Sequence, residues 1–162
     1  MYFTELTHSA IGSITTNGTI KEYRTPTDPA GGGSRPIAVA IRDCQVWFTE
    51  ERGHRFGVLD PSTGKITEYP IPRPTDQLAG LAFDRTGTLW LELNGATGVD
   101  AIGRVGANMV VSLVDVPTHN ATLHRIILGP DGNMWFTELT ADKVGYITAL
   151  TSSATPSAST GI

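Results

Sequence analysis

The sequence predicts an all-β fold, a β-propeller built from four-stranded antiparallel sheets. The segment Trp-Phe-Thr-Glu at 135–138 returns at 47–50, as Tyr-Phe-Thr-Glu at 2–5, and in degraded form as Trp-Leu-Glu-Leu at 90–93. The copies start 45, 43 and 45 residues apart. One propeller blade takes about 40–45 residues, so the spacing indicates one blade per copy. Short apolar runs alternate with turn residues along the whole chain, which is typical of strands and hairpins.

The first repeat unit, about 1–26, opens in the middle of a blade. Its predicted strands cover residues 1–6, 10–14 and 19–23. Asn17-Gly18 is a strong hairpin signal between the second and third of these strands. The segment 25–36 contains three Pro and three consecutive Gly, and therefore reads as a long loop.

The second unit, about 36–72, is complete. Its predicted strands cover residues 37–41, 46–50, 56–59 and 65–69. The run Ile-Ala-Val-Ala-Ile at 37–41 is entirely apolar, which predicts a strand buried on both faces near the propeller axis. Asp-Pro-Ser-Thr-Gly at 60–64 combines residues that favour a tight turn before the last strand.

The third and fourth units, about 77–117 and 122–150, repeat this pattern with drift. Their predicted strands cover residues 78–83, 89–93, 101–105, 109–116, 123–128, 134–139 and 143–147. The segment 94–100 is about three residues longer than its counterparts. From 151 to 162 the composition changes to Ser, Thr, Ala, Pro and Gly, which predicts a disordered tail.

These strands make about four blades per chain, of which the first and the last each lack one strand. An open array exposes strand edges that invite pairing. Closure with a second copy, as a homodimer with about eight blades, is one explanation. A fragment of a longer gene, only marginally stable alone, is the alternative.

Composition excludes several classes of function. The net charge of -4 and the absence of Lys/Arg runs argue against nucleic acid as a partner. No apolar run approaches the roughly 18 residues of a membrane span, and no signal peptide is evident, so we expect a soluble, cytoplasmic protein. The single cysteine, Cys44, excludes an internal disulfide and a cysteine-rich zinc site. It reads as an incidental thiol at a turn.

The repeat motifs resemble those of one enzyme family. Gly-Pro-Asp-Gly-Asn-Met-Trp-Phe-Thr-Glu (129–138), Ile-Gly at 11–12 and 102–103, and Ile-Thr-Glu-Tyr (66–69) are similar to the virginiamycin B lyase, or streptogramin lyase, family over residues 1–148. Members of that family are seven-bladed propellers that confer antibiotic resistance. They open the lactone ring of type B streptogramins by elimination with a magnesium ion. The match is to about half of such a protein.

The resemblance also implies site residues. The family's site draws on a histidine at the start of one innermost strand, a Glu-x-His pair at the start of the next, and the glutamate of the following strand. Carried over by position, His124 matches the catalytic histidine of the pair and Glu138 matches a metal ligand. Thr122 stands where the other metal carboxylate is expected, and Ala79 where the first histidine is expected.

Three functions follow as hypotheses. The first is a non-catalytic, vestigial propeller module that self-associates and binds a small ligand at the propeller axis, without a cofactor. The second is a magnesium-dependent carbon–oxygen lyase that uses His124 and Glu138. The third is a scaffold for protein partners through the loop 25–36.

Ordinary structural explanations stand beside these hypotheses. Because Glu138 has equivalents at Glu5 and Glu50, each glutamate is expected to accept hydrogen bonds from backbone donors in its own sheet. The aromatic residues at 2, 47, 90 and 135 are expected to pack between blades. His8 and His54 are expected in exposed hairpin loops together with Asp142.

Overall fold

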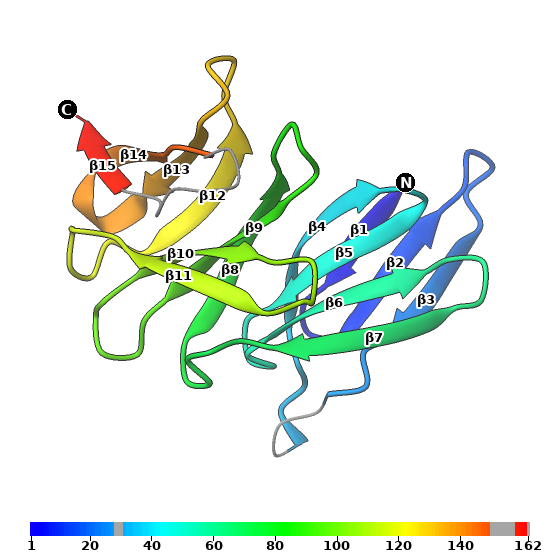
Figure 1. Cartoon of the computed structure of the whole chain (residues 1–162). Coiled ribbons are helices and arrows are strands. Elements are labelled where there is room, and N and C mark those ends of the chain that lie inside the picture. Colours follow the sequence, from blue (N-terminus) through cyan, green and yellow to red (C-terminus); the bar gives the residue numbers. More distant parts are fainter. Residues whose placement is uncertain (28–30, 150–157, 162) are drawn as a thin grey trace. The chain divides into compact units, whose positions relative to one another are not determined.

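The structure is a computed structural model that describes residues 1–27, 31–149 and, by backbone alone, 158–161. The chain divides into two compact units, Met1–Leu78 and Ala79–Ile162. Almost all regular structure is β-strand, arranged in four antiparallel sheets (Figure 1). In the described part of the chain, no helix has the length and apolar character needed to cross a membrane.

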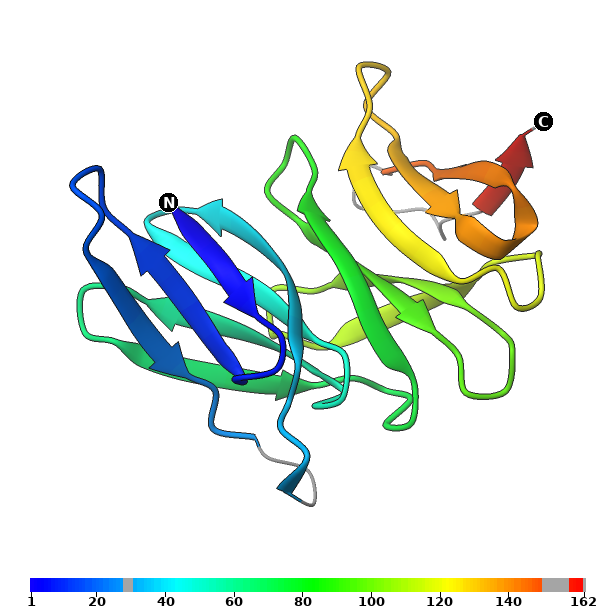
Figure 2. The same cartoon turned by 180° about the vertical axis from the view of Figure 1, so that it is seen from behind.

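The first unit contains two sheets. The three-stranded sheet has the order β1-β2-β3 and comprises β1 (Tyr2–Glu5), β2 (Ala10–Ile14) and β3 (Ile20–Arg24). The four-stranded sheet comprises β4 (Pro36–Arg42), β5 (Gln45–Glu50), β6 (Arg55–Asp60) and β7 (Lys65–Pro70), in chain order. Strand β1 lies beside β4, the first strand of the second sheet (Figure 2). Their shared core contains Ile11, Val46, Phe48 and Leu59.

The second unit also contains two sheets. One comprises β8 (Gln77–Phe83), β9 (Leu89–Asn94), β10 (Ala101–Val105) and β11 (Val111–Asp115). The other comprises β12 (Leu123–Leu128), β13 (Met134–Glu138), β14 (Lys143–Ile147) and β15 (Ala158–Gly161), with the short 3₁₀ helix η2 (Leu139–Ala141) after β13. Strand β9 packs beside β12. The core between the two sheets includes Trp90, Ile102, Leu123, Ile126 and Phe136.

A phenylalanine over a glycine is the packing unit that recurs in the sheets. Phe48 of β5 lies opposite Gly57 of β6, and a Cβ atom on that glycine would fall 2.2 Å from the ring. The pairs Phe3/Gly12 and Phe136/Gly145 repeat the arrangement, each with a 2.3 Å approach. Glycine in a strand permits such a close approach because it has no side chain. This explains the glycine of the Ile-Gly motif at 11–12, whereas Gly103 of the second motif lies opposite Leu91.

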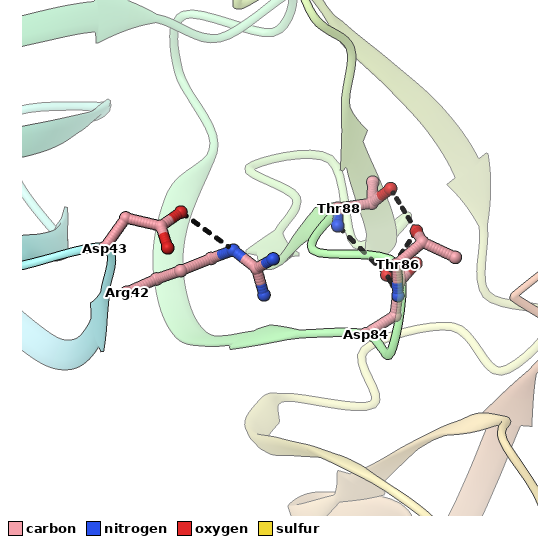
Figure 3. Close-up of polar contacts among 5 residues, drawn as sticks. All are labelled: Arg42, Asp43, Asp84, Thr86 and Thr88. Atoms are coloured by element: carbon pink, nitrogen blue, oxygen red, sulfur yellow. Dashed lines mark hydrogen bonds and ion pairs between the residues drawn. The ribbon is translucent and has the colours of Figure 1, made fainter.

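An aspartate organises the hairpin between the first two strands in both sheets of the second unit. Asp84 accepts hydrogen bonds from the backbone N–H groups of Thr86 (2.8 Å) and Thr88 (2.9 Å) (Figure 3). Its other carboxylate oxygen accepts one from Trp90 Nε1 at 2.9 Å. Burial alone would raise the pKa of Asp84, but these hydrogen bonds outweigh it and lower the pKa below its usual value. Asp131 likewise accepts from Trp135 Nε1 at 3.1 Å. The tryptophans therefore anchor turns.

Two predictions about strands differ from the structure. Residues 151–157 and 162 of the predicted tail lie outside the described residues, but 158–161 form β15, which pairs with β14 and gives that sheet a fourth strand. Backbone hydrogen bonds along a free strand edge do not require apolar side chains. The predicted burial of both faces of the strand 37–41 is wrong, since β4 is mostly half-buried and Ile41 is 59% exposed.

Candidate functional site

His124 lies in an irregular part of the pairing between β12 and β13. Leu123 pairs with Glu138 and Ile126 with Phe136, so the register shifts between them and His124 falls in the bulge. The imidazole is exposed, and the main-chain carbonyl of His124 accepts a hydrogen bond from Arg125 Nη1 at 3.3 Å. Bulges redirect side chains. An exposed imidazole at this position has access to solutes.

Glu138 ends strand β13 and is 1% exposed. Neither carboxylate oxygen has a hydrogen-bond partner. The expectation that this glutamate binds backbone donors of its own sheet is therefore wrong. Burying a carboxylate without donors is costly, and a cation would offset the cost. Because Leu123 lies opposite Glu138, the register does not place His124 across from this carboxylate.

Thr122 and Ala79 occupy the other positions implied by the resemblance. Thr122 immediately precedes β12 with a φ of 54°, and its N–H donates to Asp100 Oδ2 at 3.0 Å. Arg35, which precedes β4 in the first unit, has a φ of 56°. Left-handed backbone thus precedes β4 in the first unit as well as β12 in the second, and is not confined to the position of Thr122. Ala79 is 4% exposed in β8 and brings only a methyl group.

These residues do not fit a magnesium ion. Magnesium requires near-octahedral oxygen coordination and dehydrates reluctantly, so a single carboxylate must be completed by several waters or substrate oxygens. A side chain that is 1% exposed, as that of Glu138 is, leaves little room for them. Glu138 offers one buried carboxylate with unpaired oxygens, while Thr122 offers a hydroxyl and Ala79 no donor. Within the described part of the chain, no group of three or more His, Cys, Asp or Glu side chains could hold a metal.

Glu92 is a buried carboxyl that the sequence analysis did not single out. It lies in β9, at 0% exposure, where the other sheets have Thr4, Thr49 and Thr137. Its Oε2 accepts a hydrogen bond from Gly80 N at 2.9 Å, and its Oε1 is buried without a partner. Burial raises the pKa of Glu92 to about 8, against the opposing effects of the Gly80 N–H and the Arg125 guanidinium. In the sequence, the only sign of this buried carboxyl group is that Glu92 stands where the other three copies of the motif have threonine.

Glu50 of the first unit has a similar environment at a different position. It ends β5 and is 0% exposed. Burial, followed by the neighbouring Glu68 carboxylate, raises its pKa to about 8. Each unit therefore contains a carboxyl group that is protonated near neutral pH. Groups with strongly shifted pKa values often mark functional sites, but they also occur in structural networks.

The longer segment after β9 positions the start of β12. Asn94 donates from Nδ2 to the carbonyl of Leu123 at 3.1 Å and accepts from its N–H at 2.7 Å. Asp100 joins two parts of this region, because Oδ1 accepts from Gly95 N at 2.9 Å and Oδ2 accepts from Thr122 N. The extra residues thus brace the strand that carries His124.

The two loop histidines differ from each other. His8 is exposed, as expected, and its Nδ1 lies 3.4 Å from Glu5 Oε2. His54 was expected to be exposed but is half-buried, with Nδ1 2.7 Å from the carbonyl oxygen of Asp76. That contact between the β5–β6 turn and the segment before β8 explains the burial. Among the described residues, neither histidine belongs to a group of three or more His, Cys, Asp or Glu side chains that could hold a metal ion.

Comparison with known proteins gives one consistent result. The model of the virginiamycin B lyase family matches residues 1–156. A streptogramin B lyase structure is 27% identical with a TM-score of 0.81, covering 97% of this chain and 49% of that one. The virginiamycin B lyase of Staphylococcus aureus is 33% identical with a TM-score of 0.80, covering 98% and 50%. No match is found among curated proteins.

A third solved structure is a catalytically inactive histidine-to-alanine variant of the Staphylococcus aureus virginiamycin B lyase with quinupristin. It is 34% identical with a TM-score of 0.79, covering 91% of this chain and 48% of that one. The chain spans about half the length of the solved structures it matches. The likeness confirms the predicted all-β, β-propeller fold, while the number of blades stays a prediction.

Proposed function

Because the chain belongs to the virginiamycin B lyase family, we propose that it is a propeller module that binds a small ligand at the axial end of its sheets without the family's elimination reaction. The observation that supports this proposal is the small number of side chains that could bind a metal or take part in the reaction. Glu138 is a single carboxylate, and Ala79 and Thr122 replace the groups that the resemblance implies. Elimination needs a positioned base and stabilisation of developing negative charge. His124 offers only the first of these.

The proposal predicts no turnover of a type B streptogramin. Purified protein, incubated with quinupristin and magnesium, is expected to yield ring-opened product no faster than buffer alone, as measured by mass spectrometry. The His124→Ala variant serves as the matched control, because the exposed imidazole can be removed without disturbing the core. Turnover by the wild-type chain that is lost in His124→Ala would refute the proposal.

The competing function is a magnesium-dependent carbon–oxygen lyase that opens the lactone ring of type B streptogramins. The observation that favours it is the exposed His124 at the start of β12, in the strand that pairs with the one ending at Glu138. In this function His124 would take the proton from the substrate. A related lyase is catalytically inactive when one of its histidines is replaced by alanine. The incubation above separates the two functions.

We also propose that two copies of the chain associate through strand β1. Met1 and Ile14 exchange two backbone hydrogen bonds, Met1 N to Ile14 O and Ile14 N to Met1 O, both at 2.9 Å. In an antiparallel pair every second residue bonds in this way, so the backbone groups of Phe3 and Glu5 also point toward β2. The backbone groups of Tyr2 and Thr4 then point away from β2. The sheet β1-β2-β3 has three strands, while the other three sheets have four. An open edge of this kind favours pairing with another chain.

Light scattering tests this association. We expect a species of twice the 17.3 kDa chain mass, and a shift toward the single-chain mass in Thr4→Pro, which removes an outward-pointing donor. A control variant, Thr16→Pro, alters the β2–β3 turn and is expected to leave the mass unchanged. A wild-type species of 17.3 kDa at all concentrations would contradict the association.

A further inference from the structure

A polar cavity in the first unit belongs to neither the lyase-like positions nor the β1 edge. It has a volume of about 350 Å³ and lies between the β1–β2 turn and the segment that follows β3. Its described lining comprises residues 7–9, Arg24, Thr25, Thr27 and the glycines 31–33. Binding sites for small molecules have volumes of about 300–1,000 Å³, so this cavity has room for a small ligand.

The charge of the described lining is positive or neutral. It contains Arg24 and His8, and no aspartate or glutamate. Arg24 Nη1 donates to the carbonyl of His8 at 3.3 Å, which holds the guanidinium at the cavity while its remaining N–H groups stay available to a ligand. Two acids contact the lining from outside it: Glu5 lies 3.4 Å from His8 Nδ1, and Glu68 accepts hydrogen bonds from the N–H (3.0 Å) and the hydroxyl of Thr27. Because the Glu68 carboxylate is bonded to Thr27, we expect the ligand's anionic group to bind at the Arg24 end of the cavity. A guanidinium is suited to carboxylate and phosphate groups.

One wall of the cavity is bare backbone. Gly31 has a φ of 75°, and a Cβ atom placed on it would meet nothing within 4 Å. A Cβ atom on Gly33 would lie 2.1 Å from Ser9 Oγ, so the segment packs tightly against the turn. Arg52 Nη1 donates to the carbonyl of Gly32 in the same segment at 3.4 Å. Glycine allows a ligand to approach the main chain closely.

Buried hydroxyl groups fix the geometry of the cavity. Thr25 Oγ1 donates to the carbonyl of Ser9 at 2.9 Å and lies 2.6 Å from the hydroxyl of Ser34. The backbone N–H of Thr25 also donates to Ser9 O at 2.9 Å. Thr25 is 9% exposed and Ser34 0% exposed. These bonds join the turn to the segment after β3, so the cavity is formed before any ligand arrives.

We propose that this cavity binds a small molecule through a carboxylate or phosphate group held by Arg24. The glycine segment supplies a backbone wall and the turn residues supply hydroxyl groups. The proposal does not depend on lyase activity, since His124 and Glu138 belong to the other unit.

Nuclear magnetic resonance titration at low ionic strength tests it, with inorganic phosphate and acetate as separate probes. We expect saturable shifts in the amides of residues 7–9, 24–27 and 31–33 with at least one probe. Arg24→Ala is expected to weaken binding at least tenfold, with a smaller loss in Arg24→Lys. The control Arg42→Ala removes one positive charge at an exposed turn, where Arg42 pairs with Asp43 at 3.3 Å (Figure 3). It is expected to bind like the wild type.

Binding of phosphate alone, or of acetate alone, would identify which group the natural ligand carries. The absence of saturable shifts with both probes would overturn the proposal. Equal weakening by Arg24→Ala and Arg42→Ala would also overturn it, because the effect would then come from overall charge. If Arg24→Ala loses its folded spectrum, the Arg24→Lys comparison decides, since it keeps the charge while changing the geometry.

Discussion

Replacing Gly57 by alanine is expected to lower the free energy of unfolding by about 2–3 kcal/mol. The added methyl group would lie 2.2, 2.7 and 2.8 Å from three atoms of the Phe48 ring, and that ring is fully buried. The loss of backbone freedom in the unfolded chain offsets only about 0.4–1 kcal/mol of this cost. Urea denaturation followed by circular dichroism measures the change.

A double-mutant cycle separates this contact from a general effect of alanine in a strand. The smaller side chain in Phe48→Leu leaves space for the methyl group, so Gly57→Ala should cost less in the Phe48→Leu background. The sheet of β8–β11 already has the smaller residue, with Leu91 opposite Gly103. A wild-type-like stability of Gly57→Ala, within about 0.5 kcal/mol, would show that the ring and the backbone move apart at little cost.

Replacing Glu92 by glutamine is expected to flatten the dependence of stability on pH. Because burial raises the pKa of Glu92 from 4.5 to about 8, the folded protein holds a proton that the unfolded chain releases. The resulting stability is fully present below pH 4.5 and is lost as the pH rises to about 8. The slope is at most about 1.4 kcal/mol per pH unit for one group. Glutamine keeps an acceptor for the Gly80 N–H and carries no charge.

The measurement is urea denaturation at a series of pH values from 5 to 9. Glu92→Gln should exceed the wild type in stability at the alkaline end and approach it at the acid end. The exposed Glu22 offers a matched control, since Glu22→Gln should leave the slope unchanged. Glu50, whose pKa burial also raises to about 8, should give a second, independent reduction of slope in Glu50→Gln. A wild-type stability that stays flat from pH 5 to 8 would contradict both assignments.

The strands could be predicted because their signals are local. Alternating apolar residues, Asn17-Gly18 and the turn aspartates all act over a few residues, and the structure has strands at every predicted position. The strand β15 escaped prediction because its Ser and Thr residues pair through backbone groups along an existing edge. The amino-acid composition of residues 158–161 does not indicate that they pair with β14.

The sequence predicted the positions of the candidate site residues but not their exposure or their contacts. The resemblance pointed to His124 and Glu138 without indicating that one is exposed and the other buried. The bulge at Leu123/Ile126 separates them, and bulges depend on the pairing of two strands that meet only after folding. Glu92 looked like part of a degraded repeat. Its burial against Gly80 arises from contacts between β8 and β9 that its local sequence does not specify.

By itself, the sequence determined the repeat, the β-strands and the membership of a lyase family, because periodicity and turn chemistry are written in short stretches of chain. Tertiary structure alone decided which polar groups are withdrawn from water: the unpaired Glu138 carboxylate, the protonated Glu92 and the hydroxyl groups behind the Arg24 cavity. Burial and strand register depend on residues distant in the chain, and the free energy of a charge depends mainly on how much water the fold removes from it.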